Sequence, residues 1–176
     1  MRLEPFADRH LEGLHEMNRK PEVMQFITGR PETREQTAAA IARVQRCWAA
    51  LGTSWWAFIE PTGGRVVGAG CIQYARRAAV MPDDLESLRG NPLEIGWRLH
   101  PDFWHLGLAS EAAASMTAFA FDNLAAHELI AVRHPDNIAS RRVMDRLGMR
   151  YRGMETWYGE SLATHALSRT DYQSRR

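Results

Sequence analysis

The chain has 176 residues, of which 45% are hydrophobic and 24% are charged, and its formal net charge is +1. This length and composition are those of one ordinary globular domain. The near-neutral charge excludes a protein that its overall field would draw to nucleic acid or to an acidic membrane surface.

The first half of the chain predicts helices between strand-forming segments. Arg2 to Phe6 reads as a short strand, and Asp8 is expected to cap the helix that follows it. Thr33 and Gln36 have the spacing of a capping box. An apolar stripe at helical spacing follows them, and Gly52 is expected to close this helix.

The middle of the chain predicts a β-hairpin and then a long irregular segment. Ser54–Glu60 and Arg65–Tyr74 are rich in strand formers, and a Pro-Thr-Gly-Gly turn separates them. Ala75–Pro92 is polar and is expected to be a long loop or a short helical insertion, of the kind that is often functional. Leu93–His100 alternates between apolar and other residues, which indicates a strand.

The last third predicts alternating helices and strands. Together these elements favour one mixed α/β domain over residues 1–176, with a partly antiparallel sheet. The expected elements are a helix over 107–123, a strand over 128–133, a helix that begins at Asn137 and ends at Gly148, and strands over 150–158 and 161–167.

The turn between the strand at 93–100 and the next helix has the composition of an anion site. Gly107 and Ala109 are small residues at the start of a helix, where consecutive backbone N–H groups can point into one concavity. The positive end of the helix dipole adds to the attraction for phosphate. A simple tight turn remains the alternative at this point, since glycine is common where helices begin.

Two other phosphate motifs are excluded. No GxxxxGK[ST] loop is present. The run from Gly68 begins like a dinucleotide fingerprint, but Gln73 stands where the third glycine belongs. Gly68 and Gly70 are therefore interpreted as strand glycines at a β-bulge.

Two blocks of the sequence resemble the GNAT superfamily of N-acetyltransferases. Trp104 to Ala109 is similar to the family's pyrophosphate loop, Gln/Arg-x-x-Gly-x-Gly/Ala, with tryptophan at the first position. Tryptophan there is typical of the RimJ/RimL-like branch. The run Pro135 to Met149 is similar to a second family block that carries Asn137, Ser140 and a terminal Leu-Gly-Met. The resemblance extends in order over nearly the whole chain and is weakest at 75–92.

This resemblance implies a single GNAT-like domain with a mixed sheet of about seven strands, splayed in the middle and flanked by helices. It implies acetyl-CoA as the acyl donor, with its pantetheine between the strands at 93–100 and 128–133. The cofactor-binding residues that it implies are Leu99, through its backbone, then Trp104, His105, Leu106, Gly107, Leu108, Ala109 and Ser110 around the pyrophosphate, with Asn137 and, for the CoA phosphates, Arg142.

Glu94 and Ser140 are the candidate catalytic residues. By resemblance, acetyl passes directly to an amine. Glu94 stands where the family often has an acidic residue, and it is expected to remove the amine proton, directly or through a water. An exposed strand-end carboxylate paired with Arg98 is the alternative. Ser140 occupies the place where many family members have a tyrosine that protonates the leaving thiolate. Asn137 and Ser140 are also a natural helix cap, which would be a structural role.

The expected partner is an amine acceptor, either a protein N-terminal α-amine or a small-molecule amine. A catalytically silent acyl-CoA-binding module and a transferase for larger acyl groups remain alternatives. The histidines show no metal-ligand spacing, so no metal is expected. No nucleic-acid or membrane partner is expected, while a homodimer is possible. The N-terminus lacks a signal-peptide pattern, and the default expectation is a cytoplasmic protein with reduced cysteines.

Overall fold

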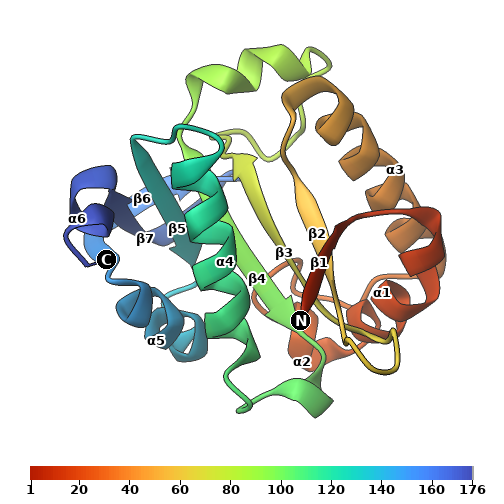
Figure 1. Cartoon of the computed structure of the whole chain (residues 1–176). Helices are drawn as coiled ribbons and strands as arrows, with labels where there is room; N and C mark the ends of the chain where they lie inside the picture. The colour runs from red at the N-terminus through yellow and green to blue at the C-terminus, as the bar shows by residue number, and fades with distance from the viewer. Residues whose placement is uncertain (176) are drawn as a thin grey trace. The chain divides into compact units, whose positions relative to one another are not determined.

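The computed structural model describes residues 1–175 as a mixed α/β fold (Figure 1). Within this part of the chain seven strands hydrogen-bond in the order β1-β2-β3-β4-β5-β7-β6. The strands are β1 (Arg2–Pro5), β2 (Trp55–Ile59), β3 (Val66–Tyr74), β4 (Leu93–Leu99), β5 (Glu128–Arg133), β6 (Arg150–Trp157) and β7 (Glu160–Ser168). The predicted fold class and strand number are confirmed.

The α-helices lie between these strands, close to where the sequence pattern predicts them. They are α1 (Leu11–Asn18), α2 (Pro21–Met24), α3 (Arg34–Leu51), α4 (Leu108–Asp122), α5 (Ile138–Leu147) and α6 (Arg169–Gln173), with short 3₁₀ helices η1 (Asp8–His10), η2 (Leu85–Gly90) and η3 (Pro101–Phe103). In the described part of the chain no helix is both long and apolar enough to cross a membrane.

The chain divides into two compact units. The first contains Met1–Cys71 and Trp97–Ala112, and the second contains Ile72–Gly96 with the described residues from Ala113 onward. The division falls within β3, β4 and α4, each of which contributes residues to both units. The prediction of a single domain over the whole chain stays a prediction.

Helices α1, α2 and α3 share one apolar core with Phe6, β2 and β3 in the first unit. The core buries Phe6, Leu14, Met17, Val23, Met24, Ile41, Val44, Ala57, Ile59, Val66 and Ala69. The capping box at the start of α3 is confirmed, because Gln36 N donates to Thr33 Oγ1 at 3.2 Å and Thr33 N donates to Gln36 Oε1 at 2.8 Å. Gly52 closes α3 with a left-handed φ of 73°.

The predicted cap at Asp8 is wrong. The chain first makes the 3₁₀ turn η1, so Asp8 lies inside a turn and α1 begins only at Leu11. The backbone N–H of Ala7 is satisfied by His10 Nδ1 at 3.1 Å. The Asp8 carboxylate instead accepts a hydrogen bond from Gln45 Nε2 at 3.2 Å. The sequence pattern at Asp8 is that of a helix cap. The pattern does not reveal that a 3₁₀ turn precedes the α-helix, and the prediction failed for that reason.

Gly68 lies beside a β-bulge, as its sequence context suggested. The register of β2 against β3 shifts between Phe58, opposite Gly68, and Ile59, opposite Val66. A Cβ at Gly68 would stand 2.7 Å from the Arg98 carbonyl oxygen and 2.9 Å from Phe58 Cδ2. The absence of a side chain is therefore what lets β2, β3 and β4 approach here.

Gly68→Ala is expected to lower the free energy of unfolding by about 1–3 kcal/mol, because the added methyl group must displace backbone as well as side-chain atoms. Urea denaturation of the purified protein measures this loss. Gly90→Ala is the matched control, since a Cβ at Gly90 would meet nothing within 4 Å. A Gly68→Ala protein as stable as Gly90→Ala would contradict this account of the bulge.

The second unit contains the point where two parallel strands separate. β4 pairs with β5 at two positions, Leu93 opposite Leu129 and Glu94 opposite Ile130. β5 continues to Arg133, and all six of its residues pair with β7. The short parallel ladder agrees with the predicted splay, since the ladder between β4 and β5 ends at Glu94.

The cap residues of α5 behave as the sequence predicts. Asn137 Oδ1 accepts a hydrogen bond from Ser140 N at 3.0 Å, and Gly148 adopts a left-handed φ of 79°. Met149 N donates to Met144 O at 3.0 Å, which completes the C-terminal capping motif. These contacts fix the helix that carries the second family block.

Candidate active site

The loop before α4, in the first unit, presents a run of unpaired backbone donors. His105 and Gly107 have left-handed φ values of 62° and 80°. Among the described residues, the N–H groups of 105–109 have no hydrogen-bond acceptor, and Ser110 N is the first to donate, to Gly107 O at 3.0 Å. Successive N–H groups in alternating left- and right-handed conformations form an anion-binding nest, and here a helix N-terminus follows it.

The loop is open to solvent beside Gly107. A Cβ built at Gly107 meets no atom within 4 Å, so the concavity is open at the glycine. Leu106 is 64% exposed, so the chain does not cover its own donors. Because those donors are backbone groups, they would bind a pyrophosphate without a basic side chain.

Trp104 is tied to the end of β4. Its indole Nε1 donates to the Leu99 carbonyl at 2.9 Å. His100 N donates to Val67 O of β3 at 2.9 Å, so the adjacent Leu99 carbonyl points to the opposite edge of β4. The indole therefore already contacts the backbone position at which pantetheine binding was predicted. A carbonyl has two lone pairs, so a second donor can still use Leu99 O.

Glu94, in the second unit, is buried rather than exposed. Its side chain belongs to the described core, with 6% of the residue's surface accessible. The alternative of an exposed carboxylate paired with Arg98 is wrong. Arg98 Nε instead donates to Asn18 Oδ1 at 3.1 Å, and its guanidinium lies 4.6 Å from the ring centre of Trp55.

Two residues that sequence analysis did not select hold the Glu94 carboxylate. The Tyr158 hydroxyl donates a hydrogen bond to Glu94 Oε2. Gln73 Nε2 lies 3.4 Å from the same oxygen and donates to the Tyr158 hydroxyl at 3.1 Å. The other oxygen, Oε1, accepts no hydrogen bond from the described residues. Gln73 had been considered only as a departure from a dinucleotide motif, and no motif marked Tyr158.

The environment of Glu94 gives it the acidity of a base that works near neutral pH. Burial raises the pKa of Glu94 from 4.5 to about 7, while the hydrogen bonds from Tyr158 and Gln73 and the positive charge of Arg76 act to lower it. Desolvation is the largest of these effects. A carboxyl group with this pKa can take and release a proton at physiological pH.

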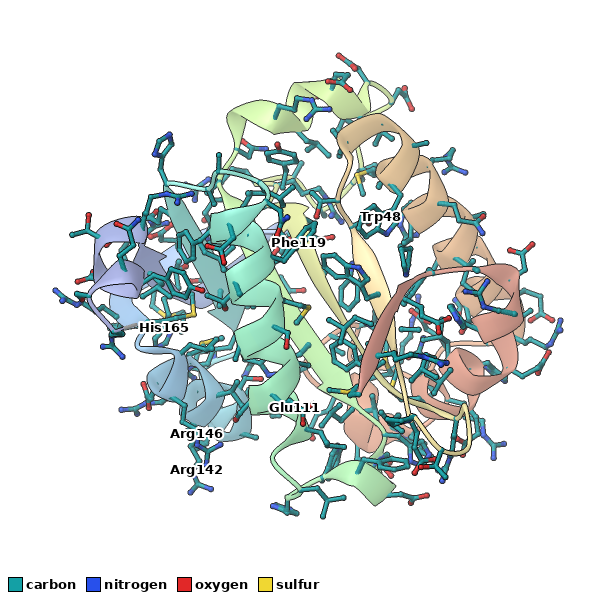
Figure 2. The ribbon with its side chains drawn as sticks, viewed as in Figure 1. Trp48, Glu111, Phe119, Arg142, Arg146 and His165 are labelled. Carbon is teal, nitrogen blue, oxygen red and sulfur yellow. The ribbon has the colours of Figure 1, made fainter. Side chains whose placement is uncertain are left out.

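The remaining candidate residues lie on or before α5. Asn137 caps the helix, and the Ser140 hydroxyl makes no hydrogen bond within the described chain. Arg142 is exposed and forms no ion pair with any described residue. Figure 2 shows Arg142 and Arg146 pointing away from the body of α5. Both cations are therefore accessible to a ligand.

The described residues contain no group of three or more His, Cys, Asp and Glu side chains that could hold a metal ion. His100 is 1% exposed, and its Nε2 lies 3.0 Å from Glu16 Oε2. This histidine is thus engaged in the packing of the first unit.

A family model described as an acetyltransferase (GNAT) domain matches residues 1–150. The chain belongs to the GNAT acetyltransferase family. The glycine loop and the second sequence block both lie within the matched residues.

This GNAT acetyltransferase is similar to one named acetyltransferase in sequence and to another in fold. FsC-acetyl coenzyme A-N(2)-transacetylase of Aspergillus fumigatus is 29% identical over 91% of the chain, which spans only 66% of that protein's length. The aminoglycoside acetyltransferase AAC(6')-Ib, solved with paromomycin and acetyl-CoA, matches with a TM-score of 0.79 at 13% identity, covering 99% of this chain and 96% of the other.

The RimJ/RimL-like branch stays a prediction for this GNAT acetyltransferase. A putative ribosomal-protein-serine acetyltransferase of Vibrio cholerae matches with a TM-score of 0.72, covering 94% of this chain and 92% of the other. Its sequence identity is 15%, which shows a common fold and no more.

Proposed function

We propose that the chain transfers acetyl from acetyl-CoA to a primary amine of modest basicity, with Glu94 as the general base. The observation that carries this proposal is the buried Glu94 carboxyl, whose pKa is raised to about 7 and whose Oε1 accepts no hydrogen bond from residues 1–175. A structural carboxylate would instead have both oxygens paired, since an unpaired buried acceptor is costly.

The unpaired N–H groups of the loop before α4 support the binding roles in this proposal. In the first unit, the N–H groups of 105–109 and the start of α4 hold the pyrophosphate and the Leu99 backbone contacts the pantetheine. In the second unit, the roles of Arg142 toward the outer phosphates and of Asn137 toward the pantetheine rest on the family resemblance alone. The cosubstrate supplies an acetyl group activated as a thioester. Five unpaired N–H groups in an exposed loop support this assignment.

The proposed reaction consists of proton transfers to and from named residues and one exchange of bonds at the acetyl carbon. Glu94 Oε1 takes a proton from the ammonium group, directly or through one water. The neutral nitrogen then forms the new C–N bond while the C–S bond breaks. The Ser140 hydroxyl gives a proton to the departing sulfur and regains one from the amine or solvent. Its lack of a hydrogen-bond partner among residues 1–175 supports this role.

The pKa of Glu94 favours an α-amine over a lysine side chain. The free energy of deprotonating an ammonium group with a pKa near 8 at neutral pH is about 1 kcal/mol. For a lysine with a pKa near 10.4 it is roughly 4–5 kcal/mol. A base with a pKa of about 7 lies within about one pH unit of the α-amine's pKa, so it can deprotonate that amine more readily than a lysine. The name of the A. fumigatus relative also specifies an N(2) position.

Thiol release from acetyl-CoA tests this proposal. We expect kcat/KM at pH 7 to be about 100-fold higher for a peptide with a free α-amine and no lysine than for an α-blocked lysine peptide, because the free-amine fractions differ by roughly that factor. Activity should fall below pH 7, where Glu94 takes up a proton. Equal rates at pH 7 would contradict the proposed acceptor class. Binding without thiol release from any amine would identify a non-catalytic acyl-CoA-binding module.

A further inference from the structure

Tyr158 has a backbone conformation that its side chain disfavours. Tyr158 and Gly159 have φ values of 57° and 80° and form the two-residue turn between β6 and β7, with Trp157 opposite Glu160. Turns of this type usually place asparagine, aspartate or glycine at both positions. A bulky aromatic with positive φ is an outlier, and such outliers collect at functional sites.

The insertion between β3 and β4 braces this turn. Tyr158 N donates to Arg76 O at 2.9 Å, and Gly159 N donates to Arg77 O at 2.9 Å. Arg77 Nη1 donates to Thr156 O at 2.9 Å. The first residues of the insertion therefore continue the hydrogen bonding of the hairpin beyond its last strand pair.

Two arginines of the same segment fix the aromatic rings of the turn. The Arg76 guanidinium lies 4.6 Å from the centre of the Tyr158 ring, and the Arg77 guanidinium lies 3.8 Å from the Trp157 ring. The backbone and ring of Tyr158 are both held, which leaves its hydroxyl fixed on Glu94 Oε2.

We infer that Tyr158 is a positioning residue for Glu94 and that the insertion at Ala75–Pro92 serves to hold it in place. The Tyr158 hydroxyl and Gln73 occupy Oε2, so that Oε1 is the oxygen presented to the amine. This inference rests on the proposed role of Glu94 for its effect on activity, while its effect on the carboxyl group itself is independent of that role.

The Tyr158 hydroxyl also sets the acidity of Glu94. Of the groups that face Glu94, Tyr158 and Gln73 donate hydrogen bonds and Arg76 is the charged neighbour, and all three lower its pKa. Loss of the hydroxyl removes a stabilising donor from the carboxylate, so the pKa of Glu94 must rise. The deprotonated base then forms only at higher pH.

Tyr158→Phe should move the acid limb of the kcat/KM profile upward by about one pH unit, the size expected for one hydrogen bond to a charged group. At pH 7 this lowers kcat/KM by roughly fivefold, because about half of the wild-type carboxyl is deprotonated there, and near pH 9 the variant should recover to within about threefold of wild type. Tyr151→Phe is the matched control, because Tyr151 lies on the same hairpin, is 59% exposed and does not contact Glu94.

Carbon-13 NMR titration of the glutamate carboxyl groups gives a readout that needs no turnover, with Glu94 assigned by its disappearance in Glu94→Gln. We expect the Glu94 titration to shift upward in Tyr158→Phe and to stay unchanged in Tyr151→Phe. An unshifted titration in Tyr158→Phe would overturn the inference. A shifted titration together with a flat wild-type pH–rate profile would support the positioning role and reject Glu94 as the base.

Arg77→Ala tests the insertion separately, since it removes a brace and leaves the Tyr158 hydroxyl and Arg76 in place. The Glu94 titration should move in the same direction by a smaller amount, about half a pH unit. An unchanged Glu94 titration in Arg77→Ala would show that the insertion does not hold Tyr158 in place.

Discussion

Glu94→Gln is expected to lower kcat by about 100-fold or more, within the range typical for loss of a general base. Glutamine keeps the shape of the side chain and can still accept hydrogen bonds from Tyr158 and Gln73 through its amide oxygen. It has no oxygen that can take a proton from the amine. The affinity for acetyl-CoA should stay within about twofold, because Glu94 is not among the proposed ligands of the phosphates.

The same substitution should raise stability at high pH. The pKa of Glu94 is raised from 4.5 to about 7 in the folded protein, so between these values the folded state binds more protons than the unfolded state. The free energy of unfolding therefore falls as pH rises through this window, by roughly 3 kcal/mol in total. Glu94→Gln removes this loss and should be the more stable protein at pH 8.

Steady-state kinetics and urea denaturation at pH 5 and pH 8 measure both effects. Glu86→Gln serves as the control, because Glu86 is an exposed carboxylate paired with Arg89 on the insertion. Lower activity joined to higher stability at pH 8 identifies a group that is costly to the fold and useful to the reaction. Lower stability of Glu94→Gln at pH 8 would instead indicate a structural carboxylate.

Gly107→Trp is expected to weaken acetyl-CoA binding by at least about 30-fold, since the loss of several charge-assisted hydrogen bonds exceeds 2 kcal/mol. Gly107 has a φ of 80° and open space where a Cβ would lie. The indole would therefore project into the concavity that the unpaired N–H groups surround, and it would exclude the pyrophosphate.

Gly64→Trp controls for backbone strain, because Gly64 has a φ of 68° and also meets no atom within 4 Å of a built Cβ. It lies in the turn between β2 and β3, which has no proposed part in binding. Calorimetric titration with acetyl-CoA should show near wild-type affinity for Gly64→Trp. Micromolar binding retained by a folded Gly107→Trp protein would remove the loop from the binding site.

Local sequence patterns determined most of the secondary structure and the position of the glycine loop before α4. The capping box at Thr33, the glycine ends of α3 and α5, and the hairpin turn depend on residues a few positions apart, whose steric and hydrogen-bonding preferences act within one turn of chain. Gly107 was recognisable for the same reason. The position of Asp8 inside a 3₁₀ turn was not recognisable, because a 3₁₀ turn and an α-helix begin with similar residues.

Only the tertiary structure decided the state of Glu94. Its neighbours Gln73 and Tyr158 lie 21 and 64 positions away in the chain, and the strand register and the bracing insertion bring them together. The sequence identified an acidic residue on a strand, but burial and hydrogen bonding determine whether that residue is an ordinary surface carboxylate or a buried carboxyl group with a pKa of about 7. Both depend on contacts between distant segments, which spacing along the chain does not encode.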